Sequence, residues 1–554
     1  MLTIGIYGIT DTTYYEERPT YAHDHSIVIM KNGEVVSAVQ LERYTGIKHD
    51  NKLSLSITSI IEKYADISED IRIVSVNSFL GNSFISSDGN LRIEPLSKMN
   101  VEDIIVPAYC KYYFDGLNEK KVKAYVMCHE FAHVASCLPF IGKLKSNSLM
   151  VHIDGGAYNS SSSVWYYDGK CIQCLDYNWN ELKDVMNNFN SNPLVCFILG
   201  HELKDHLSIP GKLMGYSSYG EANPEIMDWL QENSFFLDFQ GNEDELLDII
   251  NIHFKTDFKR FDIHNLFFMD IAACIQKDFQ EKIFTFIEKW SNKTGVEYLY
   301  YSGGAALNII TNSMIEGSGL FKEIFVPPAA SDCGLALGAA AYLEYLDHSE
   351  IKKQSPFLNN FDVPSYSELS EIDLEEVAEH LQEGKIIGIC MGASEIGPRA
   401  LGHRSIIARA DDIGIRKKVS EDIKKREWYR PIAPIVADFV AKEIFTRDIC
   451  ESNLAAYMLG QYIVKEEYRS YLKGVIHVDG SVRVQVIKAG DEGNKNLYCL
   501  LELMYQKFGT LGLINTSFNV NGSPIVHFHE DAYSSAKKMG LDGVVVSDRF
   551  YKFE

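Results

Sequence analysis

The sequence predicts an α/β protein of two domains, the first of which is internally duplicated. Two observations lead to this fold class. The chain has 554 residues, of which 46% are hydrophobic and 12% aromatic, and one ordinary core cannot bury so much apolar material. In addition, a pattern of one strand, one loop of small or polar residues and one β-hairpin occurs twice.

The first copy of this pattern begins near the N-terminus. Alternating hydrophobicity predicts a strand at residues 3–9 and two further strands at 26–30 and 35–40. Asn32 and Gly33 lie between the last two strands, and an Asn-Gly pair supplies the two positive φ angles that a tight hairpin turn requires.

The second copy follows later in the chain. It has a strand at residues 149–154, a loop rich in Gly and Ser, and strands at 163–167 and 171–176 joined by Asp168 and Gly169. Two copies of the same order of elements indicate an internal duplication.

Helical patterns connect and follow the two copies. The clearest helix is predicted at residues 266–290, where apolar residues recur on one stripe, and a strand at 297–301 follows. This order of elements fits the architecture of actin, Hsp70 and the sugar kinases, in which two related halves enclose a nucleotide cleft. Periodicity alone does not establish that architecture.

A polar stretch at residues 347–371 separates two regions of regular hydrophobic pattern. We therefore predict a first domain at residues 1–350, a linker at 351–371 and a second domain at 372–554. Strands expected among the helices of the second domain are at 386–390, 475–486, 511–515 and 544–546. The second domain is thus predicted to be α/β as well.

The charge of the chain limits its partners. Lys and Arg number 53 against 76 Asp and Glu, so the formal net charge is -23. Such a chain repels nucleic acids and anionic membranes, and no apolar run is long enough to span a bilayer. We expect neither nucleic acid nor membrane as a partner, and an anionic ligand must be bound locally.

Cysteine usage and the first residues favour a cytoplasmic protein. The opening residues follow a strand pattern and lack a basic segment followed by an apolar core, so we expect no export signal. Cys171 and Cys174 are close in sequence but have no second pair at zinc-site spacing, and the cysteines are expected to be reduced thiols.

A candidate metal site begins with His129 and His133. They are four residues apart in a helical pattern, so both imidazoles project from one face and suit a shared ion, although such pairs are also common as ordinary core or surface histidines. Asp154, after a strand and before two glycines, and Asp332, which opens a helical segment, are the candidate carboxylates. Helix capping is the alternative role of Asp332.

A second candidate site is formed by Gly303 and Gly304. They end a predicted strand and precede a helix, where backbone amides suit a phosphate. Lys212 and Asn308 are candidate contacts to a nucleotide or its sugar. A solvated lysine and a capping asparagine are equally good explanations.

The strongest physical signal lies between Arg399 and Arg430. This segment carries ten Lys or Arg residues against five Asp or Glu, which reverses the charge of a strongly acidic chain. Arg416, Lys417 and Lys418 are assigned to a solvated helix face. For five of the other seven we prefer phosphate binding: Arg399, Arg404, Lys425, Arg426 and Arg430.

This predicted anion site also includes three residues from later in the chain. Arg483 is a candidate to join the arginines, and Ser517 and Asn519 follow a predicted strand, where they suit an anion or a ribose. Asx and Ser bonds that stabilise a turn are the competing explanation for the last two.

A series of blocks in this order resembles the NodU/CmcH carbamoyltransferases over nearly the whole chain. The blocks are HDHS, ERYTGIKHD, CHEFAHVASC, VHIDGG, GKLMGYSSYG, YSGGAALN, PPAASDCGLALGAA, EIGPRALGHRSI, KKREWYRPIAPIV, HVDGS and NTSFNVNGSPIV. The resemblance implies an actin-like (ASKHA), Kae1-like domain at residues 1–350 and a YrdC-like domain at 372–554.

The resemblance also implies a reaction in two steps. The YrdC-like domain forms carbamoyl-adenylate and pyrophosphate from carbamoyl phosphate and ATP, with Mg²⁺ accompanying ATP. The Kae1-like domain then transfers the carbamoyl group to a hydroxyl of a small molecule. The metal site implied is of the iron type, with Fe²⁺ held by His129, His133, Asp154 and Asp332.

Three residues receive catalytic roles in this scheme. Arg404 and Lys425 are expected to act in the adenylate-forming step. His23 is the candidate general base, because an imidazole titrates near neutrality and accepts the hydroxyl proton as the new bond forms.

Some positions differ from the family pattern. His25 replaces a small residue, Leu41 an acidic one, and Gly46-Ile47 a basic pair, so contacts to the acceptor are expected to differ here. Ser394 replaces a Met, and we expect this change to leave phosphate binding intact.

Two other functions were weighed against carbamoyl transfer to a small molecule. Threonylcarbamoyl transfer to tRNA is disfavoured by the net charge of -23 and by the lack of a basic extension. A nucleotide-binding protein without catalysis is disfavoured by the joint presence of a metal constellation and a basic pocket. The acceptor, the metal and the oligomeric state, including a homodimer, are left open.

Overall fold

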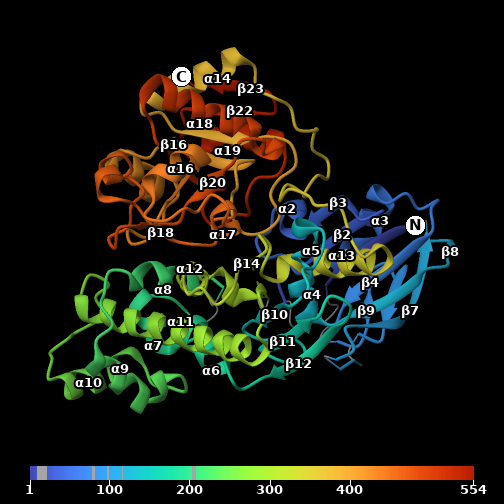
Figure 1. The fold of residues 1–554 in the computed structure, drawn as a ribbon, viewed down its shortest axis with the longest axis horizontal. Helices are drawn as coiled ribbons and strands as arrows, with labels where there is room; N and C mark the ends of the chain where they lie inside the picture. The colour runs from blue at the N-terminus through green and yellow to red at the C-terminus, as the bar shows by residue number, and fades with distance from the viewer. Residues whose placement is uncertain are drawn as a thin grey trace.

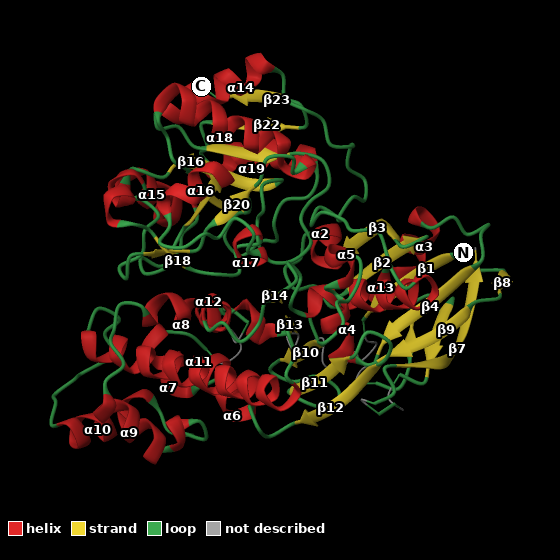
Figure 2. Ribbon diagram, viewed as in Figure 1, coloured by secondary structure: helices red, strands yellow, loops and turns green. Residues whose placement is uncertain are grey.

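The computed structural model describes residues 1–8, 22–77, 81–96, 99–100, 102–114, 116–202 and 207–553. The chain forms three large sheets. Figures 1 and 2 show the sheet of the C-terminal domain above the two sheets of the N-terminal part. The predicted end of the first strand, Ile9, lies outside the described residues.

The first sheet has the strand order β3-β2-β1-β4-β9-β7-β6-β5, with β8 paired to β7. Its central strand β1 is antiparallel to β2 and parallel to β4. The strands are β1 (Leu2–Tyr7), β2 (Ser26–Lys31), β3 (Glu34–Gln40), β4 (Ile71–Val76), β5 (Phe84–Ile85), β6 (Leu91–Glu94), β7 (Ile105–Phe114), β8 (Asn118–Lys120) and β9 (Lys123–Met127).

The second sheet repeats the core of the first. Its order is β12-β11-β10-β13-β14, and its central strand β10 is antiparallel to β11 and parallel to β13. The strands are β10 (Ser148–Ile153), β11 (Ser162–Tyr167), β12 (Ile172–Asn178), β13 (Tyr298–Ser302) and β14 (Glu323–Phe325). Because order and direction agree with β3-β2-β1-β4-β9, the predicted internal duplication and the duplicated actin-like fold are confirmed.

Helices of the N-terminal part cover and connect these two sheets. They are α2 (Leu41–Thr45), α3 (Ile57–Tyr64), α4 (His129–Ala135), α5 (Leu138–Ile141), α6 (Lys183–Asn190), α7 (Pro193–Leu199), α8 (Ile209–Ser217), α9 (Pro224–Glu232), α10 (Glu243–Phe254), α11 (Leu266–Thr294), α12 (Ile309–Gly317) and α13 (Leu335–His348). The long helix α11 was predicted, and its ends follow its sequence: the Asn265 side chain accepts from the Phe267 amide, and Gly295 ends it at a φ of 64°.

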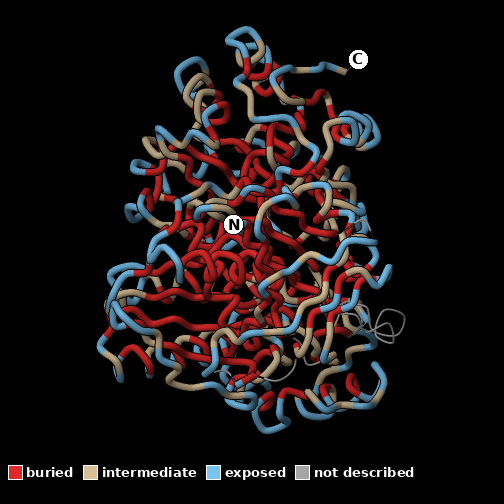
Figure 3. Tube along the Cα trace, turned by 90° about the vertical axis from the view of Figure 1, so that its right-hand side faces the viewer, coloured by how far each residue is buried: buried red, intermediate tan, exposed pale blue. Residues whose placement is uncertain are grey.

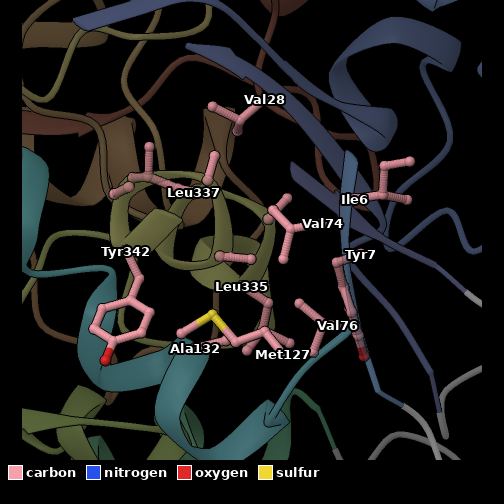
Figure 4. Packing of buried hydrophobic residues seen from close by; sticks show 14 of the residues in the cluster. Ile6, Tyr7, Val28, Val74, Val76, Met127, Ala132, Leu335, Leu337 and Tyr342 are labelled. Carbon is pink, nitrogen blue, oxygen red and sulfur yellow. The ribbon is translucent and has the colours of Figure 1, made fainter. Parts of the chain in front are cut away.

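Helices α4 and α13 pack together against the first sheet. Figure 4 shows Ala132 of α4 and Leu335, Leu337 and Tyr342 of α13 facing the side chains of β1, β2, β4 and β9 in one buried cluster. Tyr7, at the end of β1, belongs to the same cluster. The core thus fixes α4, which carries His129 and His133, and the start of α13, which directly follows the short turn that contains Asp332.

The C-terminal domain contains a sheet of order β20-β17-β21-β16-β15-β22-β23. Its strands, with the short pair β18–β19, are β15 (Ile387–Cys390), β16 (Arg404–Arg409), β17 (Ala433–Ala437), β18 (Tyr462–Ile463), β19 (Ser481–Val482), β20 (Gln485–Ile487), β21 (Leu513–Ser517), β22 (Gly543–Val546) and β23 (Arg549–Lys552). Its helices are α14 (Glu371–Gln382), α15 (Ile413–Lys417), α16 (Asp438–Ile444), α17 (Asn453–Ala456), α18 (Lys495–Phe508) and α19 (His529–Met539).

Helices pack against this sheet through two apolar clusters. Residues of α14 and α18 belong to one cluster, and residues of α16 and α19 to the other. An α/β C-terminal domain was predicted and is confirmed.

The predicted strand at 475–486 is wrong over its first half. Residues 475–480 form a turn, and only the short β19 and β20 follow. The Asp479 carboxylate accepts from the Ser481 amide at 2.9 Å, and Gly480 has a φ of 79°. This Asx bond and the left-handed glycine bend a segment whose apolar residues resemble a strand.

The segment between α13 and α14 joins the two parts of the chain. The Asn359 amide group is bonded to Gln40, the last residue of β3, and its backbone pairs with Ser394 of the C-terminal domain. Figure 3 shows buried chain concentrated at the centre and exposed chain at the periphery. No helix in the described ranges is both long and apolar enough to cross a bilayer.

Candidate active site: a His/Asp cluster and a basic cluster

The four predicted metal ligands lie together, and we name them the His/Asp cluster: His129, His133, Asp154 and Asp332. The two imidazole Nε2 atoms are 3.2 Å apart. His133 Nε2 lies 3.4 Å from Asp332 Oδ1 and 3.7 Å from Asp154 Oδ2. The helix α4, the end of β10 and the turn before α13 therefore bring two nitrogen and two oxygen donors to one point.

Neighbouring groups orient these donors. Tyr7 donates its hydroxyl to Asp332 Oδ2 at 2.6 Å, and His133 Nδ1 lies 3.1 Å from the Ala330 carbonyl oxygen, to which it donates when protonated. When Nδ1 carries the proton, the Nε2 atom of His133 keeps a lone pair that can bind a metal ion.

The glycine pair predicted to hold a phosphate also supports this cluster. The Gly304 amide donates to Asp154 Oδ2 at 2.6 Å. Gly303 has a φ of 100°, and a Cβ atom there would lie 2.1 Å from the Ile153 carbonyl oxygen. Gly303 thus permits a close crossing of backbones, and the Gly304 amide is engaged by a carboxylate.

Burial and mutual charge set the pKa values of the cluster. Burial lowers the pKa of His129 to about 3, so this imidazole is neutral. Burial alone would raise the pKa of Asp332, but a hydrogen bond to His133 and the nearby histidines hold it well below its usual range. Burial alone would lower the pKa of His133, but Asp332 and Asp154 raise it, and burial raises the pKa of Asp154. Binding of a divalent transition metal displaces the protons of these groups, and two imidazoles with two carboxylates are a donor set that suits the iron-type ion that we predicted.

Residues 129–133 also match an H-E-x-x-H pattern, which in metalloproteases supplies a glutamate base. Glu130 does not serve the cluster in this way, because its carboxylate accepts from the Ser160 amide at 3.0 Å and from the Asn159 amide. It fixes the loop after β10, and burial raises its pKa.

The predicted base His23 belongs to a pair of histidines that share one carboxylate. His23 Nδ1 lies 3.0 Å from Asp24 Oδ2, and His49 Nδ1 lies 2.9 Å from Asp24 Oδ1. Burial alone would lower the pKa of His23, but Asp24 outweighs it and raises that pKa to about 9. His23 is thus largely protonated at neutral pH in the metal-free protein, and its Nδ1 is fixed by Asp24.

Three of the departures from the family pattern, at His25, Leu41 and Gly46-Ile47, lie near His23 or His49 in the sequence. His25 is fully buried, and its ring stands edge-on to Tyr7 at 5.5 Å. Within the described ranges, neither of its ring nitrogens has a hydrogen-bond partner. Leu41 is buried at the start of α2, and Gly46 ends that helix with a φ of 72°. Ile47 is 58% exposed.

Five cations of the C-terminal domain form what we name the basic cluster: Arg399, Lys424, Arg426, Arg430 and Arg483. Enclosure in the protein and like charges lower the pKa of Arg399 to about 10 and that of Arg426 to about 9. The pKa of Arg483 is lowered further for the same reasons, with Arg399, Arg426 and Arg430 as its charged neighbours.

Hydrogen bonding in the basic cluster is incomplete. The Nε atoms of Arg399 and Arg483 are buried and have no hydrogen-bond partner in the part of the chain that the structure describes. Only Arg430 of the four arginines has a carboxylate within ion-pair distance among the described residues, Glu427 at 3.6 Å. Guanidinium groups brought together in this way suit the oxygens of a phosphate.

Lys424 is placed in the basic cluster, whereas the predicted Lys425 points outward. Lys424 is 3% exposed, and its Nζ donates to the carbonyl oxygens of Ser517 and Asn519, each at 2.7 Å. Lys425 is exposed and has a φ of 50°. Ser517 and Asn519 thus hold a lysine in place.

Arg404 is the predicted site residue whose surroundings differ most from expectation. It is fully buried, and its five N–H groups are used by backbone carbonyl oxygens at 2.8–3.2 Å. Those carbonyls belong to Met391, Gly392, His403 and His527. No donor of Arg404 is left for a phosphate, so we do not retain it in the anion site and assign it to fixing the surrounding loops.

Lys212 contacts the C-terminal domain, whereas Asn308 caps a helix of the N-terminal part. Lys212 of α8 forms an ion pair of 2.7 Å with Glu427, next to Arg426. Asn308 caps α12 by accepting from the Thr311 amide and is bonded to Gln276. The capping role weighed for Asn308 is the one observed.

Two family models match most of the chain. The model "Carbamoyltransferase N-terminus" covers residues 123–341, and "Carbamoyltransferase C-terminus" covers residues 378–552. The chain belongs to the carbamoyltransferase family. It is a carbamoyltransferase enzyme whose two matched regions contain the His/Asp cluster and the basic cluster, respectively.

Relatives of this carbamoyltransferase cover all or part of the chain. Nodulation protein NolNO of Sinorhizobium fredii is 28% identical over 96% of this chain and 79% of the relative. Nodulation protein U of Azorhizobium caulinodans is 24% identical over 90% of this chain and 92% of the relative. The 3'-hydroxymethylcephem-O-carbamoyltransferase of Amycolatopsis lactamdurans is 33% identical over 46% of this chain and 48% of the relative.

Among solved structures, full-length HypF in its phosphate- and nucleotide-bound form matches 34% of this chain and 23% of HypF. The sequence identity is 22% and the TM-score 0.24. The repeated strand order, and not this match, shows the fold of this carbamoyltransferase.

Several residues of this carbamoyltransferase site were not singled out from the sequence: Tyr7, Asp24, His49, His152 and Lys424. All except Tyr7 lie within or beside motifs that resemble family blocks. Sequence spacing does not show that Asp24 bridges His23 and His49, because the two histidines come from segments separated by a whole hairpin.

Proposed function

We propose that this carbamoyltransferase joins two reactions. Carbamoyl-adenylate is formed from carbamoyl phosphate and ATP at the basic cluster, and the carbamoyl group is then transferred to a hydroxyl of a small molecule beside the His/Asp cluster. One observation carries the proposal: the loops that bear the two clusters touch, since Gly397 lies against Pro328. Residues 372–554 are assigned the first reaction and residues 1–350 the second.

The first reaction requires a site for several phosphate oxygens. Carbamoyl phosphate reacts with water to give carbamate and phosphate, and a carbamate oxygen then attacks the α-phosphorus of ATP, from which pyrophosphate leaves. ATP is expected to enter with Mg²⁺. Arg399, Arg426 and Arg483 form no ion pair among the described residues, so their charges are available to neutralise the phosphates and the departing pyrophosphate.

The second reaction requires a base and an oriented acceptor. The acceptor oxygen attacks the carbamoyl carbon, and its proton passes to a base. The bond between the carbamoyl carbon and the phosphate oxygen breaks, and AMP leaves with its electrons. His23 is the proposed base. Asp24 holds its Nδ1 at 3.0 Å, which directs Nε2 to the acceptor, and transfer should rise with pH as His23 loses its proton.

His129, His133, Asp154 and Asp332 are proposed to hold a divalent metal of the iron type. Such an ion, when bound, supplies positive charge that polarises the carbamoyl oxygen or binds a phosphate. The residues themselves fix one another, since Tyr7 and Gly304 hold the two carboxylates from outside the cluster.

A hydroxylated small molecule is the proposed acceptor. The net charge of -23 disfavours a nucleic acid, and one relative of the chain is named for carbamoyl transfer to a hydroxymethyl group of a cephem. His25, Leu41 and Ile47 are proposed to distinguish the acceptor of this enzyme from those of its relatives.

The test separates the two reactions. Purified protein is incubated with ATP, carbamoyl phosphate and labelled pyrophosphate, and label should enter ATP only when carbamoyl phosphate is present. A pool of hydroxylated metabolites is then added, and mass spectrometry should find a product that has gained one carbamoyl group. Absence of carbamoyl phosphate-dependent exchange would refute the proposed adenylate.

Matched variants assign each reaction to its cluster. Arg426→Met should abolish exchange, whereas His133→Ala should retain exchange and lose the carbamoylated product. Lys417→Met, on the exposed helix α15, is the control and should change neither. Equal exchange by wild type and Arg426→Met would remove the basic cluster from the first reaction.

A further inference from the structure

His152 is a buried histidine whose bonding is half complete. It lies within β10 and is fully buried. Its Nδ1 is 3.0 Å from the hydroxyl of Ser163 on the neighbouring strand β11. Its Nε2 is buried without any hydrogen-bond partner among the described residues. A buried polar atom of this kind calls for an explanation, because leaving it unpaired is costly.

The strand directs His152 toward the His/Asp cluster. Alternate residues of a strand face the same side, so His152 and Asp154 share one face of β10 and its continuation. The ring of His152 stacks on that of His133, with centroids 5.0 Å apart and 24° between the planes. Potential ligand atoms of His133, His152 and Asp154 all lie within 4.8 Å of one another.

The anchoring of His152 matches that of a known type of ligand histidine. When Nδ1 carries the proton and donates it to Ser163 Oγ, Nε2 keeps its lone pair, just as His133 does when it donates to Ala330. In metal sites the second ring nitrogen is commonly fixed by such an outer contact. Both histidines therefore offer Nε2 from an anchored ring.

We infer that His152 is a fifth ligand of the metal centre, beside His129, His133, Asp154 and Asp332. This inference rests on the metal centre of the proposed function. Three imidazoles and two carboxylates form a nitrogen-rich set, which favours Fe²⁺, Co²⁺ and similar ions over Mg²⁺ and Ca²⁺, because the latter prefer oxygen ligands. A fifth protein donor also leaves fewer positions for water or a reactant.

The inference is tested with Co²⁺ alone, bound under anaerobic conditions and followed by visible absorption. His152→Phe keeps a flat ring against His133 but has no lone pair. We expect this variant to bind Co²⁺ at least about tenfold more weakly, since even outer contacts of a metal site have effects of that size. Its absorption bands should also show a lower coordination number than those of the wild type.

His380→Phe is the matched control. His380 is likewise buried, with an unpartnered Nε2, but it lies on α14 and is in none of the candidate metal groups of the described chain. This variant should bind Co²⁺ like the wild type. Unchanged affinity and spectrum in His152→Phe would overturn the inference while leaving the four-ligand centre intact.

A measurement on the unaltered protein covers the case in which His152→Phe does not fold. Pulsed electron paramagnetic resonance of the Cu²⁺-loaded wild type counts coordinated imidazoles. Three imidazoles support His152 as a ligand, and two overturn it. If the wild type binds neither Co²⁺ nor Cu²⁺, the metal centre of the proposed function fails, and the inference fails with it.

Discussion

Gly397 lies so close to Pro328 that a Cβ atom on Gly397 would be 2.3 Å from the Pro328 carbonyl oxygen. The φ of Gly397 is 100°, which other residues rarely adopt. Pro328 lies shortly before Asp332, and Gly397 shortly before Arg399. The two domains thus touch between the loops of the two clusters.

Substitution of this glycine tests the contact. Gly397→Ala should lower the free energy of unfolding by about 1–3 kcal/mol more than Gly522→Ala. Gly522 is a matched control, because it has a φ of 81° but no atom near its Cβ position. Urea unfolding measures the difference. The variant should also release more AMP per carbamoylated product, and equal stability of the two variants would contradict the contact.

Arg404, which is fully buried, and Arg483, which is partly buried, should respond to substitution in opposite ways. Arg404→Met leaves four backbone carbonyl groups without their donors and should cost at least about 3 kcal/mol of stability. Arg483→Met removes a charge that Arg399, Arg426 and Arg430 repel, so the ligand-free protein should become more stable while ATP binds more weakly. Chemical unfolding and calorimetric titration with ATP measure both effects. A stable Arg404→Met variant that only fails to bind ATP would reverse these roles.

The carboxylate between the two histidines should govern His23. Asp24→Asn removes the charge that raises the pKa of His23 to about 9, so that pKa should fall in the metal-free protein. Nuclear magnetic resonance titration of the imidazole reports it. The pH above which transfer rises should move down with that pKa, because His23 accepts a proton only once it is neutral. His49→Gln retains Asp24 and should preserve the raised pKa; if it does not, His49 rather than Asp24 sets that pKa.

His527 should make stability depend on pH. Burial lowers the pKa of His527 to about 3, and its ring stacks on Phe361 at 3.7 Å. Below the pKa of an unfolded histidine, the unfolded chain binds a proton that the folded protein does not, so stability falls as pH falls. Between about pH 7.5 and about pH 5.5 this group should cost about 1.4 kcal/mol.

The comparison with His527→Gln isolates that effect, because other buried histidines contribute equally to both proteins. The variant should lose less stability than the wild type over the same pH range, as measured by urea unfolding. Parallel loss in both proteins would show that His527 takes up a proton within the folded structure.

Local patterns were sufficient to predict the hairpins, the long helix α11 and the duplication, because turn residues and hydrophobic period act over short distances. The failure at residues 475–480 has a local cause as well, since the Asx bond of Asp479 overrides an apolar pattern. The resemblance to the family, rather than spacing, brought Asp154 and Asp332 together with the histidines.

The roles of individual cations were harder to predict. Charge counting located the basic segment but did not distinguish Lys424 from Lys425. The inward direction of the Lys424 side chain depends on the π-helical turn at Lys418–Ile423 and on the left-handed φ of Lys425. Nor did it show that Arg404 is surrounded by carbonyl oxygens. Both outcomes depend on backbone geometry that the order of residues alone does not reveal.

The crowding of Arg399, Arg426, Arg430 and Arg483 links the supply of substrate to the lifetime of the folded enzyme. Each phosphate that binds relieves repulsion, and binding to the native state alone shifts folding by mass action. Cells rich in ATP and carbamoyl phosphate should therefore retain more of this protein against proteolysis than starved cells.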